Sequence, residues 1–262
     1  MTAHLSLILP AYRAAALLEK HVPAAQAYLS GLPIASEIIV VDDGSPDDGA
    51  TRRAAEALGV RYMANPRNLG KGAAVRAGML AASGRVRLYT DADLPFELES
   101  IEKFYWYAAH KEYPLVIGDR TLPGANYFDG IPRLRQWGSK LFSGFVGRFF
   151  VGGLYDTQCG FKAFRAEAAE DLFRVARINR FAADVELLYI ALKRNYDIKR
   201  LPVRLRVWEE SGVRILRDGL AMLRDVAFIR YNYYRGAYRP VVPVPLVLDT
   251  YPGALPPSGN HD

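Results

Sequence analysis

Two aspartates one residue apart, Asp91 and Asp93, follow the short run from Val86 to Thr90. If that run is a strand, a kink at its end turns both carboxylates toward one crevice. Hard oxygen ligands at this spacing suit Mg²⁺ or Mn²⁺, and such an ion bridges the oxygens of a diphosphate. Aspartates are also common in surface loops, so the pattern predicts a metal site only together with its neighbours in the fold.

Two other polar segments have the chemistry of a nucleotide site. Asp42 to Ser45 follow an apolar run, and a carboxylate at a strand end can accept hydrogen bonds from a nucleobase or a ribose hydroxyl. The same segment also fits a turn that caps the next helix. Asn68 to Gly72 open a predicted helix, where glycines let a phosphate approach and Lys71 adds a positive charge. This segment lacks the spacing of a Walker loop.

The elements that must position these residues alternate between strands and helices. Runs rich in β-branched residues predict strands at residues 5–9, 37–41, 60–64, 86–90 and 115–118. Helical composition predicts helices at residues 14–29, 47–58, 71–82 and 97–110. This alternation predicts an α/β protein with a doubly wound, mostly parallel sheet. Ligands of such sheets bind outside the carboxyl ends of the strands, where the polar segments lie.

The pattern changes after residue 120. A loop is expected over residues 121–132, an amphipathic helix over Arg133 to Phe150 and a second one over residues 216–227. Each helix either packs on the sheet or faces a membrane. We therefore predict one domain over residues 1–238, with a nucleotide-binding half at 1–120 and an acceptor-side half at 121–238. Residues 239–262 hold six of the sixteen prolines and predict an extended or disordered tail.

The composition narrows the class of protein. Of 262 residues, 50% are hydrophobic and 24% are charged, which excludes a disordered or fibrous chain. A lone cysteine, Cys159, excludes an internal disulfide and a cysteine-rich zinc site, so the cytoplasm is the expected compartment. The sequence contains no run of ~18 apolar residues, so a membrane-spanning helix is not expected. Residues 193–239 carry 12 basic and 5 acidic side chains, which predicts an anionic partner.

Taken together, the motifs resemble those of family 2 glycosyltransferases. They are Pro10-Ala11-Tyr12, Val41 to Ser45, Asn68 to Gly72, Asp91-Ala92-Asp93, Gly118-Asp119-Arg120 and Asp156 to Lys162. Their order and spacing cover residues 5 to about 235. Within the family, the segment from Phe181 to Ala191 is similar to that of dolichyl- or polyprenyl-phosphate sugar synthases, especially the glucosyl branch.

The resemblance implies a GT-A fold, a divalent cation (Mg²⁺ or Mn²⁺) and an inverting transfer of a hexose from a nucleotide-diphosphate sugar to a polyprenyl or dolichyl phosphate. It favours UDP-glucose as the donor. Asp91 and Asp93 would bind the metal, and Arg120 would lie near the donor sugar or the acceptor phosphate. The implied donor-binding residues are Pro10, Ala11, Tyr12, Asp42, Gly70, Lys71 and Ala92. The implied acceptor-phosphate residues are Arg133, Arg135, Ser139, Lys162, Ser211 and Arg214.

Three departures from the family pattern bear on the substrate. Arg13-Ala14 replace the usual Asn-Glu, and Ser211-Gly212 replace an expected Ser-Lys/Arg pair. Pro95 stands where mannosyl-type synthases often have a polar metal ligand. These departures favour a glucosyl-type enzyme, while a GDP-mannose-using polyprenyl-phosphate mannosyltransferase stays as an alternative.

The acceptor decides whether a base is needed. A lipid phosphate is already an anion at neutral pH, so arginines would matter more than a carboxylate. A saccharide hydroxyl would need a general base, for which Asp184 is the candidate. Asp184 fits equally well as the N-cap of the helix that follows it. A third hypothesis is a sugar-nucleotide or membrane-binding protein without turnover.

The basic C-terminal third also contains Tyr231, Tyr233 and Tyr234. Tyrosines favour the membrane interface and cations favour anionic lipids, so we expect peripheral association with the cytoplasmic leaflet. Nucleic acid is not an expected partner, because the arginines lie beside apolar stripes and no nucleic-acid-reading module is present.

Overall fold

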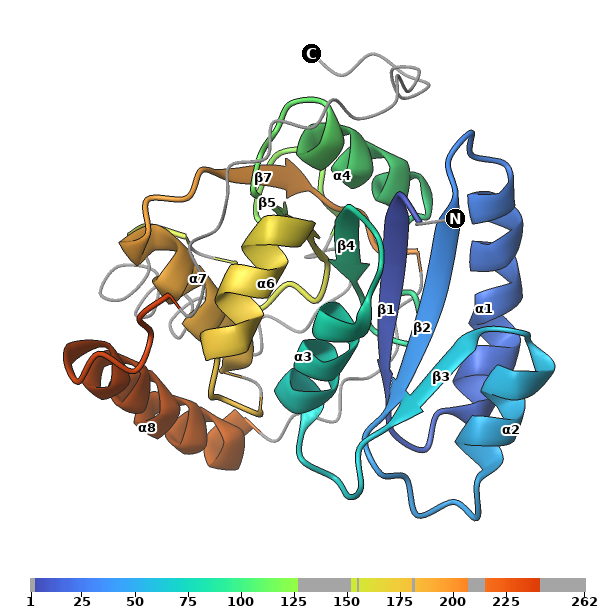
Figure 1. Cartoon of the computed structure of the whole chain (residues 1–262), viewed down its shortest axis with the longest axis horizontal. Helices are drawn as coiled ribbons and strands as arrows, with labels where there is room; N and C mark the ends of the chain where they lie inside the picture. Colours follow the sequence, from blue (N-terminus) through green and yellow to red (C-terminus); the bar gives the residue numbers. More distant parts are fainter. Residues whose placement is uncertain (1–2, 127–151, 155, 181, 207–214, 241–262) are drawn as a thin grey trace.

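The computed structural model describes residues 3–126, 152–154, 156–180, 182–206 and 215–240. Its centre is a seven-stranded sheet in the order β3-β2-β1-β4-β6-β5-β7 (Figure 1). The strands are β1 (Leu5–Ala11), β2 (Ser36–Asp42), β3 (Arg61–Ala64), β4 (Val86–Tyr89), β5 (Leu115–Asp119), β6 (Lys162–Arg165) and β7 (Ile198–Pro202). Only β6 is antiparallel to its neighbours, β4 and β5.

Helices cover both faces of the sheet. They are α1 (Ala15–Ser30), α2 (Ala50–Ala57), α3 (Lys71–Ala81), α4 (Glu99–Ala109), α6 (Ala166–Val175), α7 (Ala183–Lys193) and α8 (Ile215–Tyr234). The side chains of α8 are described from residue 224 onward. Helices α1, α2 and α4 share one hydrophobic cluster with the sheet, and α3, α6, α7 and α8 share the other. Figure 1 shows α8 at the outer edge of this second layer, next to α7.

The alternation of side chains along the strands explains the two clusters. In β2, Ile39 and Val41 enter the cluster of α3, whereas Ile38 and Val40 enter the cluster of α1. Successive side chains of a strand point to opposite faces, and a parallel sheet covered on both sides needs apolar residues at both. The continuous apolar run of β2 is therefore what its central position requires.

The strands and helices predicted over the first 120 residues are confirmed, as is the α/β, mostly parallel fold. Sequence patterns did not predict β6, which inserts between β4 and β5, or β7 at the edge. The helix predicted over residues 216–227 is part of α8. The helix predicted over residues 133–150 and most of the predicted tail lie outside the described residues.

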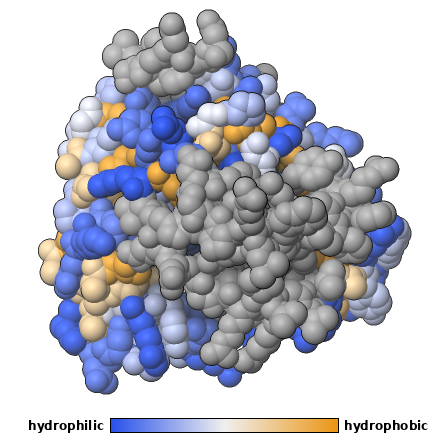
Figure 2. All heavy atoms as spheres, turned by 180° about the vertical axis from the view of Figure 1, so that it is seen from behind, coloured by the Kyte–Doolittle hydropathy of each residue, from blue (hydrophilic) through white to orange (hydrophobic). Residues whose placement is uncertain are grey.

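The surface seen from behind is mostly hydrophilic where the structure describes it, with smaller hydrophobic groups between the polar ones (Figure 2). Within the described part of the chain, every helix is too short or too polar to cross a lipid bilayer.

Candidate active site

A crevice of about 420 Å³ opens at the carboxyl ends of β1 and β2. Its walls come from four parts of the chain: the end of β1, the residue after β2, the loop into α3 with the first turn of that helix, and the loop between α6 and α7. The lining residues are Pro10, Ala11, Tyr12, Asp43, Asn68, Leu69, Gly70, Lys71, Ala74 and Arg180. The exposed Tyr12 ring offers a flat apolar surface at the mouth. This is the position at which open α/β sheets bind ligands.

Asp43 fixes the loop that enters α3. Its Oδ1 accepts hydrogen bonds from Asn65 Nδ2 at 2.8 Å and from the Leu69 N–H at 3.0 Å. Its Oδ2 accepts a hydrogen bond from the Gly70 N–H at 2.7 Å. Gly70 has φ +106°, and a Cβ there would lie 2.5 Å from the Asn179 carbonyl oxygen, so glycine is required at this position. The conformation of the loop is thus fixed by a carboxylate that itself lines the crevice.

Asp42 lies behind the crevice and does not line it. Its Oδ1 accepts hydrogen bonds from the Ser45 N–H and hydroxyl, and its Oδ2 accepts one from the Tyr62 hydroxyl at 2.9 Å. Burial, with a further contribution from the bond to Asp42, raises the pKa of Tyr62 to about 12, so Tyr62 stays a donor at neutral pH. The nearly buried Asp42 carboxylate therefore shapes the turn. Its neighbour Asp43 is equally buried but lines the crevice.

Asp91 and Lys71 form an ion pair beside the crevice, at the end of β4 and the start of α3. Burial by itself lowers the pKa of Lys71, but the carboxylates of Asp91, Asp184 and Asp93 outweigh it, and the pKa is raised overall. Three carboxylates thus surround one ammonium group. Such a site favours positive charge, which is the first requirement for binding a cation.

The surroundings of Asp91 also leave room for an ion. A Cβ at Gly160 would lie 2.5 Å from Asp91 Oδ2 and 3.3 Å from Lys71 Nζ, so this glycine keeps the space beside the carboxylate clear. No group of three or more metal-ligating side chains occurs within the described residues. Mg²⁺ and Mn²⁺ are commonly held by one or two carboxylates, with substrate phosphates and water completing the shell. The pair Asp91 and Asp93 fits a divalent cation of this kind.

Asp184 sits in the first turn of α7, behind the ion pair of Lys71. Its Oδ1 accepts hydrogen bonds from the Tyr89 hydroxyl and from Lys162 Nζ, the latter at 2.6 Å. The N-cap of α7 is Ala182, so the interpretation of Asp184 as an N-cap is wrong. Both lone pairs of Oδ1 are used by fixed donors. The carboxylate is therefore oriented by the protein, and this oxygen is not the one that would accept a proton from a substrate.

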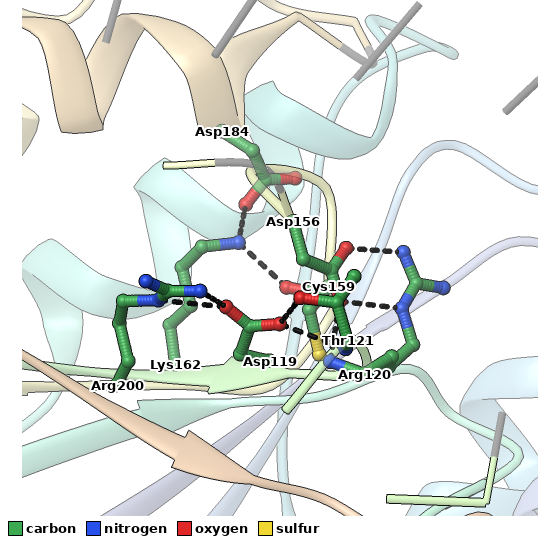
Figure 3. A network of polar contacts seen from close by, with 8 residues as sticks. All are labelled: Asp119, Arg120, Thr121, Asp156, Cys159, Lys162, Asp184 and Arg200. Atoms are coloured by element: carbon green, nitrogen blue, oxygen red, sulfur yellow. Dashed lines mark hydrogen bonds and ion pairs between the residues drawn. The ribbon is translucent and has the colours of Figure 1, made fainter. Parts of the chain in front are cut away.

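Lys162 is completely buried at the start of β6. Besides Asp184, its ammonium group donates to the Cys159 carbonyl at 2.6 Å (Figure 3). Direct contact with an acceptor phosphate, which the sequence predicts for Lys162, is incompatible with this burial. Lys162 instead supplies the positive charge that balances Asp184 inside the protein.

A second group of charges lies at the ends of β5 and β7 (Figure 3). Asp156 accepts three hydrogen bonds from Arg120: from its backbone N–H at 2.7 Å, from Nε at 2.9 Å and from Nη2 at 2.7 Å. Asp119 accepts from the Thr121 N–H and hydroxyl and from Arg200 Nε at 2.7 Å. Burial alone raises the pKa of Asp156, but the Arg120 guanidinium outweighs it and lowers the pKa overall. These pairs fix the start of the segment after β5.

Cys159 lies between the two groups of charges and takes no part in nucleophilic chemistry. Its side chain is fully buried, and burial raises the pKa of the thiol to about 12. A thiol with this pKa is uncharged at neutral pH, whereas the nucleophile and metal ligand is the thiolate.

The structure thus brings most of the predicted donor-side residues together. Pro10, Ala11, Tyr12, Gly70 and Lys71 line the crevice, and Ala92 is buried between the two aspartates of the predicted metal pair. Five of the predicted acceptor-phosphate residues lie outside the described residues: Arg133, Arg135, Ser139, Ser211 and Arg214. Their roles stay predictions.

Sequence reasoning assigned no role to four residues that the structure brings to the site: Asp43, Tyr89, Asp156 and Arg180. Asp43 and Asp156 stand inside motifs that were recognised, so the signal was present but the individual side chain was not singled out. Tyr89 looks like any strand residue, and Arg180 stands one residue before the recognised Phe181 to Ala191 segment, in the loop between two helices. Only the fold places these two beside the charges.

The chain is similar in sequence to known proteins. The model of glycosyl transferase family 2 matches residues 6–173. A dolichyl-phosphate beta-glucosyltransferase of Dictyostelium discoideum is 31% identical over 250 residues, covering 90% of this chain and 76% of that protein. The dolichyl-phosphate beta-glucosyltransferase of Homo sapiens is also 31% identical, covering 91% of this chain and 78% of the human protein.

Solved structures share the fold at lower identity. Glucosyl-3-phosphoglycerate synthase from Mycobacterium tuberculosis, in complex with Mn²⁺, uridine-diphosphate-glucose and phosphoglyceric acid, superposes with a TM-score of 0.64 at 18% identity. The match covers 88% of this chain and 79% of the mycobacterial one. The similarity establishes the architecture of the sheet and its helices.

Proposed function

Because the chain belongs to glycosyl transferase family 2 and is therefore a glycosyltransferase, we propose that it transfers glucose from UDP-glucose to a polyprenyl phosphate with inversion at the anomeric carbon. The observation that carries the proposal is the crevice at the ends of β1 and β2, with Lys71 on its wall and Asp91 paired to Lys71 beside it. The similarity to dolichyl-phosphate beta-glucosyltransferases over 90% of the chain supports the sugar and the class of acceptor.

The crevice divides into a nucleoside part and a diphosphate part. Tyr12 and Asp43 stand at the nucleoside end, where an aromatic face and a carboxylate suit a base and a ribose. Gly70, whose N–H donates to Asp43, leads into Lys71, where the positive N-terminus of α3 and an ammonium group suit phosphate oxygens. The donor sugar would then lie near Asp91.

We propose that Asp91 and Asp93 hold the divalent cation. When bound, it would neutralise the negative charge on the departing diphosphate, a contribution of several kcal/mol. The role of the protein is to hold the two carboxylates at the end of β4 and to keep Gly160 clear beside them. A relative of the same fold, crystallised with Mn²⁺ and uridine-diphosphate-glucose, is consistent with this assignment.

The state of Asp184 favours a phosphate acceptor over a sugar hydroxyl. One of its oxygens is occupied by the Tyr89 hydroxyl and the Lys162 ammonium, as expected for a positioning and electrostatic role. A phosphate acceptor is already ionised and attacks without a general base. A hydroxyl acceptor needs a general base with a free oxygen directed at the hydroxyl. The best candidate, Asp184, already has one oxygen hydrogen-bonded to Tyr89 and Lys162.

The surface of α8 fits an enzyme whose acceptor is a lipid. Of the five exposed large hydrophobic residues in the described part of the chain, four lie on this helix: Phe228, Tyr231, Tyr233 and Tyr234. Exposed arginines stand among them, and Arg235 lies over the Tyr231 ring at 5.7 Å. Aromatic rings and arginines together favour the interface of an anionic membrane. We propose peripheral association through this face, on the cytoplasmic leaflet.

The decisive experiment supplies radiolabelled donors and two acceptors in the presence of Mn²⁺ or Mg²⁺. With UDP-glucose and a short polyprenyl phosphate, we expect label in the organic phase and no label with GDP-mannose. Transfer from GDP-mannose alone would identify the mannosyl alternative. Label only in water-soluble saccharide would identify a hydroxyl acceptor, and donor binding without transfer to either acceptor would contradict turnover.

Membrane association has its own test. Full-length protein should sediment with vesicles containing anionic lipid and much less with neutral vesicles. The double variant Phe228→Ser, Tyr231→Ser should lose most of this binding, while Tyr113→Ser, a partly buried tyrosine on the opposite layer, should not. Equal sedimentation of the α8 variant and the unaltered protein would refute docking through α8.

A further inference from the structure

Arg180 reaches the crevice from the loop that immediately precedes the Phe181 to Ala191 segment. The loop joins α6 to α7, far along the chain from the residues on the other walls. Arg180 is exposed and lines the crevice together with Gly70 and Lys71. Within the described part of the chain, its guanidinium makes no hydrogen bond or ion pair. A cation that lies on the wall of a polar crevice, and that has no partner among the described residues, is positioned to bind a ligand.

The two lysines near the crevice are already balanced. Lys71 is paired with Asp91, and the buried Lys162 is paired with Asp184. Of the crevice-lining residues, Lys71 and Arg180 are the two that carry positive charge. Arg180 therefore contributes the charge that no described carboxylate offsets. An incoming diphosphate with two negative charges needs such a partner in addition to a metal ion.

The loop that carries Arg180 is fixed in place. The Asn179 carbonyl accepts a hydrogen bond from the Ala73 N–H at 3.1 Å, in the first turn of α3. Arg76 donates to the Ala176 carbonyl and to Asn179 Oδ1, at 3.1 Å and 2.8 Å. The loop is thus tied to the helix that opens at Gly70. Anchoring of this kind reduces the entropy lost when a side chain binds its ligand.

A third anchor comes from α7. The buried Glu186 accepts hydrogen bonds from the Arg177 N–H at 2.9 Å and the Ile178 N–H at 2.8 Å. The loop also packs closely on the glycine turn, because a Cβ at Gly70 would lie 3.2 Å from Arg180 Cγ. The stem of Arg180 therefore lies against the turn where the diphosphate is expected, and its guanidinium is the free end.

We propose that Arg180 binds the diphosphate of the nucleotide-sugar donor, an inference that rests on the proposed function. The planar guanidinium can donate two parallel hydrogen bonds to phosphate oxygens, which an ammonium group cannot do. Arg180 would hold the diphosphate against the Gly70 turn and balance the charge that grows as the sugar leaves. It acts on the donor, not on the acceptor.

The test measures binding separately from turnover. Isothermal titration of the full-length protein with UDP, with GDP and with uridine, each with Mn²⁺ present, gives the affinity with and without phosphates. We expect Arg180→Ala to weaken UDP binding by about 10-fold to 100-fold, as for the loss of a charged hydrogen-bonding partner, and to leave the weak binding of uridine unchanged. Arg180→Lys should recover only part of the affinity.

Arg177→Ala is the matched control, because Arg177 is exposed on the same loop but does not line the crevice. It should bind UDP as the unaltered protein does. If the unaltered protein binds neither UDP nor GDP, the proposed function fails. If it binds UDP and Arg180→Ala binds it equally well, the assignment of Arg180 fails alone. An unchanged UDP affinity with a raised KM for polyprenyl phosphate would place Arg180 on the acceptor side and also overturn the proposal.

Discussion

Two groups of carboxylates lie on either side of Cys159, one with Asp91 after β4 and the other with Asp119 and Asp156 beyond β5. They differ in their exposure and in their hydrogen-bond partners. At the end of β4, the Asp91 side chain is 41% exposed and its partner Lys71 lies in the open crevice. Beyond β5, the side chains of Asp156 and Asp119 are 6% and 1% exposed, and each accepts several hydrogen bonds from fixed donors. A buried carboxylate with all its partners supports the fold, whereas a partly exposed one with a single side-chain partner among the described residues is available to a ligand.

This difference predicts that substitutions in the first group cost activity and those in the second cost stability. The largest effect is expected for Asp91→Asn. The loss of a charged metal ligand should lower kcat/KM by about 1,000-fold or more, since it removes several kcal/mol of charge stabilisation. The midpoint of thermal unfolding should change little, because Asp91 is partly exposed and, among the described residues, its side chain is paired with Lys71 alone.

Activity with labelled donor and thermal unfolding, measured on the same preparation, check this prediction. Asp197→Asn serves as the control, since Asp197 is exposed on the loop between α7 and β7. It should match the unaltered enzyme in both assays. An active Asp91→Asn enzyme would remove the metal assignment and, with it, the contrast between the two groups.

Gly160→Ala tests the space between the groups. The added methyl group would meet Asp91 Oδ2 at 2.5 Å, and that oxygen is the end of a side chain that can turn away. The fold should therefore survive, while the displaced carboxylate should lower activity by about 100-fold and weaken Mn²⁺ binding in the presence of UDP.

The matched control is Gly31→Ala at the end of α1. Gly31 has an ordinary helical conformation, and a Cβ there meets nothing closer than 3.4 Å. Calorimetry of Mn²⁺ binding and circular dichroism would separate the two possible causes of a loss. A Gly160→Ala protein that melts far below the unaltered one would show that the position is needed for folding, contrary to expectation.

How much of these regions can be predicted from the sequence depends on whether a feature is specified by neighbouring residues or by residues distant in the chain. Strands and helices over the first 120 residues follow from local patterns, because a parallel strand covered on both faces is continuously apolar. The antiparallel insertion of β6 is set by pairing with β4 and β5, which are distant in the chain, and no local pattern specifies it. Residues such as Lys162 can be found by motif, but their burial cannot, because it depends on that pairing.

The same limit explains why the residues that line the crevice could be predicted only in part. Asp42 and Asp43 are adjacent and chemically identical, and the direction of each side chain is decided by the end of β2 and by the loop at Leu69. Sequence reasoning chose Asp42, whereas the structure points Asp43 into the crevice. Arg180 enters through the packing of the loop after α6 against α3, a contact between segments over 100 residues apart.

Asp156→Asn sharpens the other half of the comparison. Breaking this buried pair with Arg120 should lower the free energy of unfolding by ~3 kcal/mol at neutral pH. The pKa of Asp156 is lowered in the folded protein, so its contribution is present above the ordinary value of 3.8 and is lost as the pH falls through the folded value. The unaltered protein and the variant should therefore differ at pH 7 and converge on acidification below about pH 4.

Urea unfolding at pH 7 and at several acidic pH values measures this difference. Glu56→Gln, which removes an exposed ion pair with Arg52 on α2, should leave the free energy of unfolding essentially unchanged at all of them. A difference between the unaltered protein and Asp156→Asn that persisted unchanged into strong acid would show that the pair contributes through shape and not through charge.

The smallest effect is expected at Cys159, between the two groups. The thiol is fully buried with a pKa raised to about 12, so iodoacetamide at pH 8 should leave the native protein unmodified and alkylate it only after unfolding in urea. Cys159→Ala should keep activity within about threefold, because the side chain contributes packing alone. Alkylation of the native protein would mean that the segment from Asp156 to Gly160 opens in solution. The buried pairs beyond β5 would then be less rigid than their contacts indicate, and Gly160 would no longer be a fixed wall of the metal site.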